Sequence, residues 1–281
     1  MNILVFGKSG QIAKELNELV IAKFLSREEC DFSNPSDCAS IVMSSSADIV
    51  INLAAYTNVD AAEEEHDLAM AVNGKSPEAL ARACAKKGIP IIHLSTDYVY
   101  GDNDQSELVS TSKTDPLNVY GKSKLFGDLG VINSGADYVI LRTSWVFSKY
   151  GSNFLKTIVK LSKSNQILNV IDDQIGGPTP ASEIAKACLI IAAKLTSDKS
   201  LSGIYHFSGQ PNVSWAGFSR EIVSSYDSKV KINSIKSSEF NSKALRQKNS
   251  RLNCDSIMTK FGIDRPKWKI NLKNIMKEIV K

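Results

Sequence analysis

The stretch that decides the fold is NILVFGKSGQIA, residues 2–13, where a short apolar run ends at a glycine and passes into a segment of helical spacing. Gly7 and Gly10 lie in the turn, and Ala13 takes the last position of a G-x-x-G-x-x-G pattern. Such a turn lets backbone N–H groups approach a pyrophosphate at the start of the helix. An ordinary strand–helix turn is the alternative, but the place of the turn after the very first strand favours a dinucleotide site.

The rest of the first half alternates apolar runs with helical segments. Strand-like runs lie at 23–26, 48–52, 89–96 and 137–143, and segments of helical spacing lie at 11–22, 34–45, 66–87 and 118–133. Short apolar strands separated by helices are typical of βαβ units, which form a parallel sheet covered by helices on both faces. The pattern predicts an α/β protein with a Rossmann-type doubly wound parallel sheet.

The alternation becomes less regular after residue 146. A helix is expected at 151–163, a strand at 167–171, a second helix at 182–195 and a second strand at 203–208. We predict that residues 1–146 form the nucleotide-binding domain and that the chain returns to it around 180–208. Residues 147–179 and 209–281 are then expected to form a smaller α+β lobe that binds the substrate.

Composition excludes several classes of protein. The net charge is only +4 and the lysines are scattered, so we expect no nucleic-acid partner. The five cysteines are an odd number without close spacing, which argues against a disulfide framework and favours a cytoplasmic location. Neither a signal peptide nor an apolar run near the ~20 residues of a membrane span is present, so no membrane partner is expected. The three histidines are too far apart for a metal motif.

The segment after the second predicted strand bears on the choice of cofactor. It reads LSREECD, so Ser26 and Arg27 come first and no acid stands directly at the strand end. An acid there binds the free ribose hydroxyl of NAD, whereas an arginine accommodates the 2′-phosphate of NADP. NADP is favoured, and NAD stays open because Glu28 and Glu29 follow at once.

A tyrosine and a lysine stand four residues apart in NVYGKSK, residues 118–124. On a helix Tyr120 and Lys124 share one face, and a neighbouring ammonium lowers the phenol pKa from its usual value of ~10. Ser95 and Thr96 end the fourth predicted strand and offer a hydroxyl to a substrate carbonyl. Because ligands bind at the carboxyl ends of parallel strands, these groups and the glycine turn should meet in one crevice. Two ordinary surface side chains are the alternative for the pair.

A series of motifs between residues 6 and 253 occurs in the order of one known family. They are FGKSGQIA, DFSNP, VINLAAYTNVDAAEEE, VNGKSPEALA, STDYVYGD, PLNVYGKSKLFGD, RTSWVFSKYGSNF, DDQIGGPTPASEIA and NSRLN. In them the chain resembles the extended short-chain dehydrogenase/reductases, and among these the dTDP-4-dehydrorhamnose reductases. The first motif and Y-x-x-x-K belong to the wider superfamily, whereas AAYTNVDAAE, STDYVYGD, RTSWVF and DDQIGGPT are more specific.

The resemblance implies reduction of the 4-keto group of a dTDP-sugar, dTDP-4-dehydro-β-L-rhamnose, by NADPH, with NADH as the alternative. Tyr120 would be the acid that protonates the keto oxygen, Lys124 would lower its pKa and hold the ribose, and Thr96 would hydrogen-bond the same oxygen. The expected cofactor contacts, besides Tyr120 and Lys124, are Gly7, Gly10, Gln11, Ile12, Arg27, Asp31, Phe32, Ala54, Ala55 and Tyr56. Thr96, Asp97, Trp145, Asn153 and Arg251 are expected to bind the substrate.

Several of these residues have a plainer interpretation. Asp97 could cap a turn, Trp145 could pack between the lobes, and Arg251 could form a surface ion pair. His93 is interpreted as a satisfied interior polar group. Some family members carry Mg²⁺ between subunits, but only Glu15 matches a ligand here, so no metal is assigned and Mg²⁺ is left open.

The resemblance also leaves alternatives for the protein as a whole. A homodimer is one expectation, but the sequence does not reveal the oligomeric state. A reductase of a related nucleotide-4-keto-6-deoxysugar and a non-catalytic NADP-binding regulatory subunit remain as alternative functions.

Overall fold

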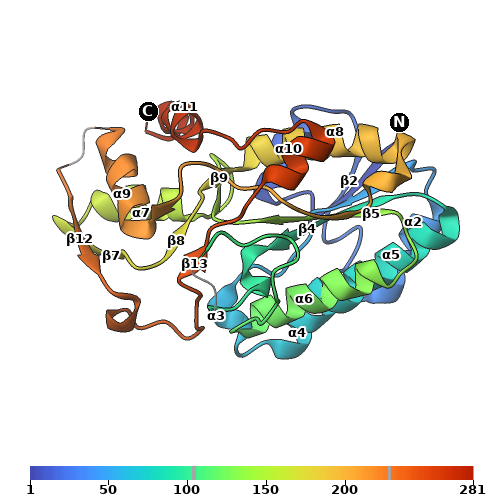
Figure 1. Cartoon of the computed structure of the whole chain (residues 1–281), viewed down its shortest axis with the longest axis horizontal. Helices are drawn as coiled ribbons and strands as arrows, with labels where there is room; N and C mark the ends of the chain where they lie inside the picture. The colour runs from blue at the N-terminus through green and yellow to red at the C-terminus, as the bar shows by residue number, and fades with distance from the viewer. Residues whose placement is uncertain (103–105, 227–228, 281) are drawn as a thin grey trace.

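A six-stranded parallel sheet forms the centre of the computed structural model, which describes residues 1–102, 106–226 and 229–280 (Figure 1). Its strands are β1 (Ile3–Phe6), β2 (Lys23–Leu25), β3 (Ile49–Asn52), β4 (Ile91–Thr96), β5 (Tyr138–Thr143) and β10 (Gly203–His206). They lie in the order β10-β5-β4-β3-β1-β2, and every neighbouring pair is parallel. The predicted doubly wound α/β fold is confirmed.

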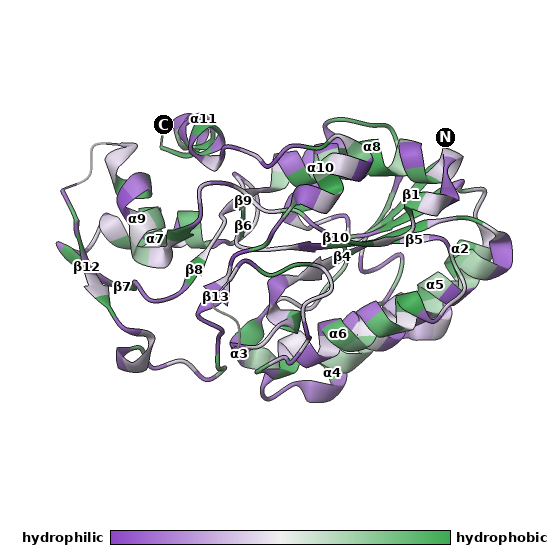
Figure 2. Ribbon diagram, in the orientation of Figure 1, coloured by the Kyte–Doolittle hydropathy of each residue, from purple (hydrophilic) through white to green (hydrophobic). Residues whose placement is uncertain are grey.

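Helices cover both faces of this sheet because successive strand residues point to opposite sides. Ile3 and Val5 of β1 pack into one hydrophobic cluster, and Leu4 and Phe6 into another. Helices α1 (Gln11–Asn17), α8 (Ala181–Ser197) and α10 (Asp255–Phe261) bury their apolar residues in the first cluster, and α2 (Pro35–Ser44), α5 (Ser76–Lys87) and α6 (Val119–Ile132) in the second. Figure 2 shows the matching pattern, with hydrophobic strands inside and polar residues along α5 and α6.

The predicted helix 66–87 is interrupted in the structure. It consists of α4 (His66–Met70), a π-helical segment (Ala71–Lys75) and α5. The Asn73 side chain in the π segment accepts a hydrogen bond from Tyr56 N (2.8 Å) and donates to Tyr56 O (2.9 Å). Such bulges occur frequently at functional sites. Here the bulge ties the segment after β3 to the helix layer.

The smaller lobe has a hydrophobic core of its own, built by α7 (Phe154–Ser162), α9 (Trp215–Ser224), α11 (Trp268–Ile279) and the parallel pair β7 (Ile167–Ile171) and β12 (Lys231–Ile235). Short ladders join it to the sheet domain. They are β6 (Val146–Phe147) with β9 (Thr179–Pro180), and β8 (Ile175–Gly176) with β11 (Val213–Ser214) and β13 (Asn249–Ser250). Two short helices, α3 (Val59–Ala62) and a 3₁₀ turn at Asp97–Val99, lie beside this junction.

The assignment of elements to the two lobes differs from the prediction in one helix, α10. β10 pairs with β5, and α8 packs on α1, so residues 181–206 lie with the sheet. Helix α10 also packs on β10 and α8, because its Ile257 and Phe261 are buried in the sheet cluster rather than in the smaller lobe. The lobe boundary near residue 146 stays a prediction. No helix in the described ranges has the length and apolarity that a membrane span needs.

Candidate active site

Two adjoining cavities lie at the carboxyl ends of the central strands. The first has a volume of about 380 Å³ and the second about 620 Å³. Ser9, Gly10, Leu53 and Ala55 line both, so the two form one continuous cleft. Ligands of open parallel sheets bind at this edge.

The predicted cofactor residues are distributed along this cleft. Gly7, Gly10, Arg27, Asp31, Phe32, Ala54, Ala55 and Tyr56 line the first cavity, and Gln11, Ile12, Tyr120 and Lys124 line the second. All of them come together although they belong to separate strand ends and helices. Their contacts with a cofactor stay a prediction.

Gly7 is the residue on which the shape of the first cavity depends. Its φ is +100°, in a region that side chains with a Cβ rarely adopt, and its N–H donates to Leu25 O. A Cβ at this position would lie 2.7 Å from Ala54 N and 2.9 Å from Ala54 Cα. The glycine therefore lets the turn after β1 approach the end of β3. This close, glycine-shaped cradle fits a dinucleotide.

Replacing Gly7 by alanine is expected to destabilise the protein by about 1–3 kcal/mol and to weaken NADPH binding at least roughly tenfold. The new Cβ must push the turn away from Ala54, and the turn is the wall of the cavity. Gly88→Ala is the matched control, because Gly88 also has a positive φ (+69°) but a Cβ added there would have no other atom within 4 Å. Fluorescence titration and thermal unfolding measure the two effects, and equal NADPH affinity in both variants would contradict the assigned role of Gly7.

The charges after β2 are arranged so that a cation faces the first cavity. Ser26 Oγ donates to Glu28 Oε2 (2.7 Å), and Ser26 N donates to Glu29 Oε2 (2.8 Å). These hydrogen bonds from Ser26 lower the pKa of both carboxyls. Neither glutamate lines the cavity, whereas Arg27 and Lys8 do. The cavity therefore has two cations next to the segment that contacts the ribose in this fold, and the acids Asp31 and Glu65 also line it.

Thr96, Tyr120 and Lys124 all line the second cavity. Asn118, two residues before Tyr120, caps the start of α6 by accepting a hydrogen bond from Gly121 N (2.8 Å). A Cβ on Gly121 would lie 2.2 Å from Tyr98 O. The glycine therefore allows α6 to pack directly against the 3₁₀ turn after β4. This contact places Tyr120 beside Thr96.

Burial governs the acidity of Tyr120. It raises the pKa of the phenol, and the negative charge of Asp97 raises it further, whereas a hydrogen bond with Thr96 lowers it. This differs from the expectation that Lys124 depresses the pKa, because Lys124 is not among the groups that shift it. Lys124 Nζ donates to Leu94 O (2.7 Å), and burial lowers the pKa of this lysine to about 8. Tyr120 is therefore a neutral phenol, the form that can donate a proton.

Asp97 connects the site with the smaller lobe. Its carboxylate accepts from Thr96 Oγ1 (3.0 Å) and from Gln247 Nε2 (3.0 Å), and burial raises its pKa to about 6. The plainer interpretation, a turn cap, does not apply, since Thr96 caps the 3₁₀ turn by accepting from Tyr98 N. Asp97 instead orients Thr96 and holds Gln247, which lies 150 residues further along the chain.

Trp145 and Asn153 line the second cavity on the side of the smaller lobe. Trp145 has a φ of +50°, and its ring stacks on Trp215 with centroids 3.5 Å apart. It both packs against the smaller lobe and forms a wall of the cavity. Asn153 caps α7 and donates to Gln11 Oε1 (2.8 Å), which joins the glycine turn to the smaller lobe. The positive φ of Trp145 is a strained backbone conformation for a non-glycine residue, of the kind found at functional sites.

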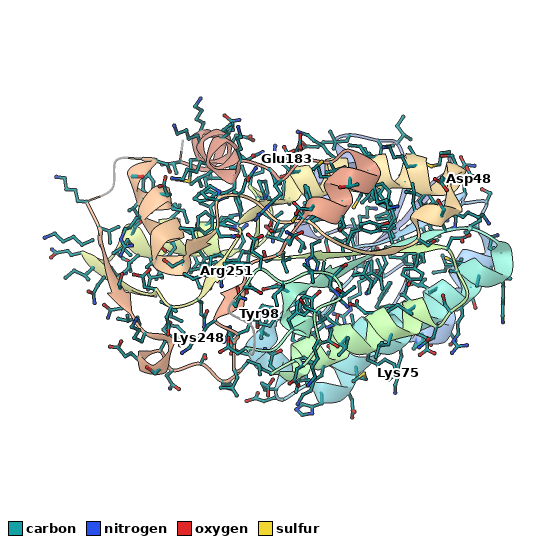
Figure 3. All side chains as sticks on the ribbon, in the orientation of Figure 1. Asp48, Lys75, Tyr98, Glu183, Lys248 and Arg251 are labelled. Carbon is teal, nitrogen blue, oxygen red and sulfur yellow. The ribbon has the colours of Figure 1, made fainter. Side chains whose placement is uncertain are left out.

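Arg251 is the predicted substrate residue that the structure keeps outside both cavities. Its Nε donates to Asn249 Oδ1 (2.8 Å), and its carbonyl accepts from Leu108 N. Figure 3 shows Arg251, like Tyr98, at the junction between the sheet domain and the smaller lobe. Its contact with a substrate stays a prediction.

Besides Lys8, which lines the first cavity, sequence reasoning missed two residues at the catalytic end of the site. Tyr98 packs edge-to-face on Tyr120 with centroids 5.3 Å apart, and Gln247 holds Asp97. Tyr98 stands within the quoted motif STDYVYGD and could have been found there. Gln247 has no local signal, because only the tertiary fold brings it to β4. Among the described residues, no group of three or more His, Cys, Asp or Glu side chains is placed to hold a metal ion.

Comparison with known proteins places this geometry in a family. Residues 1–281 match the family described as the RmlD substrate binding domain. The dTDP-4-dehydrorhamnose reductase of Sinorhizobium fredii is 41% identical over 98% of this chain and 97% of its own length. The crystal structure of such a reductase from Clostridium acetobutylicum has a TM-score of 0.92 at 30% identity and covers 100% of both chains. That from Bacillus anthracis, in complex with NADP, has a TM-score of 0.91 at 31% identity, over 99% of this chain and 100% of its own.

Proposed function

The chain belongs to the RmlD substrate binding domain family, and we propose that it reduces the 4-keto group of dTDP-4-dehydro-β-L-rhamnose to give dTDP-β-L-rhamnose. It is an NAD(P)H-dependent oxidoreductase. The observation that carries the proposal is the meeting of Thr96, Tyr120 and Lys124 in a cavity continuous with the glycine-lined one. A keto sugar in the second cavity would lie next to a cofactor in the first.

The proposed roles follow from the chemistry of these side chains. NADPH, when bound, supplies the hydride that reduces the carbonyl carbon. Tyr120 donates a proton to the keto oxygen, which it can do because burial keeps its phenol neutral. Thr96 hydrogen-bonds the same oxygen, and the Lys124 ammonium holds the ribose of the cofactor.

NADPH is the cofactor that the first cavity favours. Arg27 and Lys8 line it, and a guanidinium is well suited to bind a 2′-phosphate through paired hydrogen bonds. Asp31 also lines the cavity, but its carboxylate accepts hydrogen bonds from Ser33 N and Oγ. The acid is thus engaged within its own turn and leaves the arginine as the group available to the ribose phosphate.

The proposal also covers the location and the partners of the enzyme. We propose a cytoplasmic location, which the five buried, unpaired thiols support. A homodimer and the lack of a nucleic-acid partner stay predictions from the sequence.

Absorbance of NADPH and of NADH, followed with enzymatically made dTDP-4-dehydrorhamnose, tests the proposed function. We expect NADPH to be consumed in step with formation of dTDP-rhamnose, identified by NMR, and NADH to be used less efficiently. Consumption only with another nucleotide keto sugar would assign the chain to a related reductase. Tight NADPH binding without turnover of any such sugar would instead support a regulatory subunit.

A further inference from the structure

A group of buried titratable side chains surrounds Lys124. His93 of β4, Lys124 and Asp128 of α6 and Arg142 of β5 are each at most 2% exposed. Lys124 Nζ lies 3.4 Å from His93 Nε2, and Arg142 Nε donates to Asp128 Oδ2 (3.0 Å). Isolated charges are costly to bury, so each ion needs compensation from a neighbour.

The proton on His93 can be placed from its partners. Asn52 Oδ1 accepts from Ala54 N (3.1 Å), so the amide of Asn52 turns its Nδ2 toward His93 Nδ1 (3.0 Å). Nδ1 must then accept, and the ring proton lies on Nε2. Burial holds the pKa of His93 well below its usual value, so the ring is neutral. An Nε2–H cannot accept a hydrogen bond from Lys124, and His93 does not compensate the ammonium.

Asp128 is the acid that can compensate the positive charge of Lys124. It follows Lys124 by one helical turn, and its Oδ1 lies 3.7 Å from His93 Nε2. Its other oxygen is held by Arg142, which in turn donates to Tyr100 Oη (2.7 Å). Burial raises the pKa of Asp128, but the positive charges of Arg142 and Lys124 oppose this and favour the ionised carboxylate. The charge of Asp128 in turn favours the ammonium of Lys124.

We propose that Asp128, fixed by Arg142, is a positioning residue that keeps Lys124 charged and directed toward the second cavity. The proposal rests on the proposed function of Lys124 and extends it to a carboxylate that touches neither cavity. Removing the carboxylate would leave the Leu94 carbonyl and the neutral His93 ring as the described polar contacts of the ammonium.

The other groups that face this pair are few. They are Tyr120 on α6, His93 and Ser95 on β4, Arg142 on β5, and Asp97 and Tyr100 after β4. Asp128 is the charge that supports the ammonium: burial lowers the pKa of Lys124 and the charge of Asp128 opposes this, with a net pKa of about 8.

The test compares Asp128→Asn with the parent enzyme across the pH range. In the parent, kcat/KM should fall as pH rises through about 8, where Lys124 loses its proton. In the variant this fall should move to lower pH by about one unit or more, and kcat/KM should recover toward the parent value in acid. NADPH affinity, titrated by fluorescence at each pH, should move in the same way because Lys124 is proposed to bind the cofactor. Asp128→Glu should restore the parent profile.

Controls separate a charge effect from a folding effect. Glu78→Gln removes an acid that pairs with Arg82 on the exposed side of α5, and it should leave both profiles unchanged. If Asp128→Asn does not fold, Asp128→Leu combined with Arg142→Met replaces the pair by apolar side chains, an exchange that folded proteins often tolerate. In this double variant we expect the same shift of the kcat/KM and NADPH-affinity profiles to lower pH.

Two results would overturn the inference. One is a kcat/KM lowered by the same factor at every pH, and the other is an NADPH affinity whose pH dependence matches the parent. If the parent itself does not reduce the keto sugar, the proposed function fails, and the NADPH titration still decides whether Asp128 governs Lys124.

Discussion

Replacing Tyr120 by phenylalanine is expected to lower kcat/KM for the keto sugar by a factor of about 10²–10⁴. The ring and its packing on Tyr98 remain, so only the proton donor is lost. NADPH affinity should stay within about threefold of the parent, because the hydroxyl is a single hydrogen-bonding group among many cofactor contacts. Steady-state kinetics and fluorescence titration measure the two quantities.

Tyr98→Phe is the matched control for this experiment. Tyr98 lines the same cavity and packs on Tyr120, but its hydroxyl interacts with Arg246 rather than with Thr96. Its loss should therefore reduce kcat/KM much less than the loss of the Tyr120 hydroxyl. Near-normal turnover in Tyr120→Phe, or an equal loss in both variants, would remove Tyr120 from the role of acid.

Replacing Arg142 by alanine is expected to lower the free energy of unfolding by about 3–5 kcal/mol. The guanidinium forms a buried ion pair with Asp128 and donates to Tyr100 Oη, so its removal leaves a carboxylate without its main counter-ion. For a chain of this size the midpoint of thermal unfolding should fall by on the order of 10 °C. Differential scanning calorimetry and urea titration measure the effect.

Arg82→Ala provides the comparison on the surface. Arg82 pairs with Glu78 across one helical turn, but its side chain is 58% exposed. Solvent screens such a pair, so its loss should cost no more than about 0.5 kcal/mol. A similar destabilisation in the two variants would mean that the buried pair contributes no more than an exposed one.

The order of elements could be predicted because its signals are local. Continuous apolar runs mark strands buried on both faces, and Gly7 and Gly10 mark the turn after β1. The ends of helices were harder to predict. The helix expected at 11–22 ends at Asn17 in the structure, and the π segment around Asn73 had no signature in the apolar pattern. Asn73 holds Tyr56 across 17 residues, a contact that periodicity cannot reveal.

The residues of the candidate site also differ in whether the sequence could predict them. Tyr120 and Lys124 could be paired from their spacing on one helix, and Thr96 from its place at a strand end. Gln247 could not, because its partner Asp97 lies 150 residues away. Arg251 stands next to β13 in a motif of the family, yet its side chain lies outside both cavities.

Motif identity and spacing were enough to predict the doubly wound fold, the cofactor class and the three residues proposed to carry the chemistry, since turns and periodicity depend on near neighbours. The fold as a whole decided the electrostatics. Sequence alone suggested that Lys124 acidifies Tyr120, but burial raises the pKa of this phenol and lowers that of the lysine. The energy of a charge depends on how much water surrounds it and which ions lie nearby, and both follow from β4, β5 and α6 meeting in one buried place.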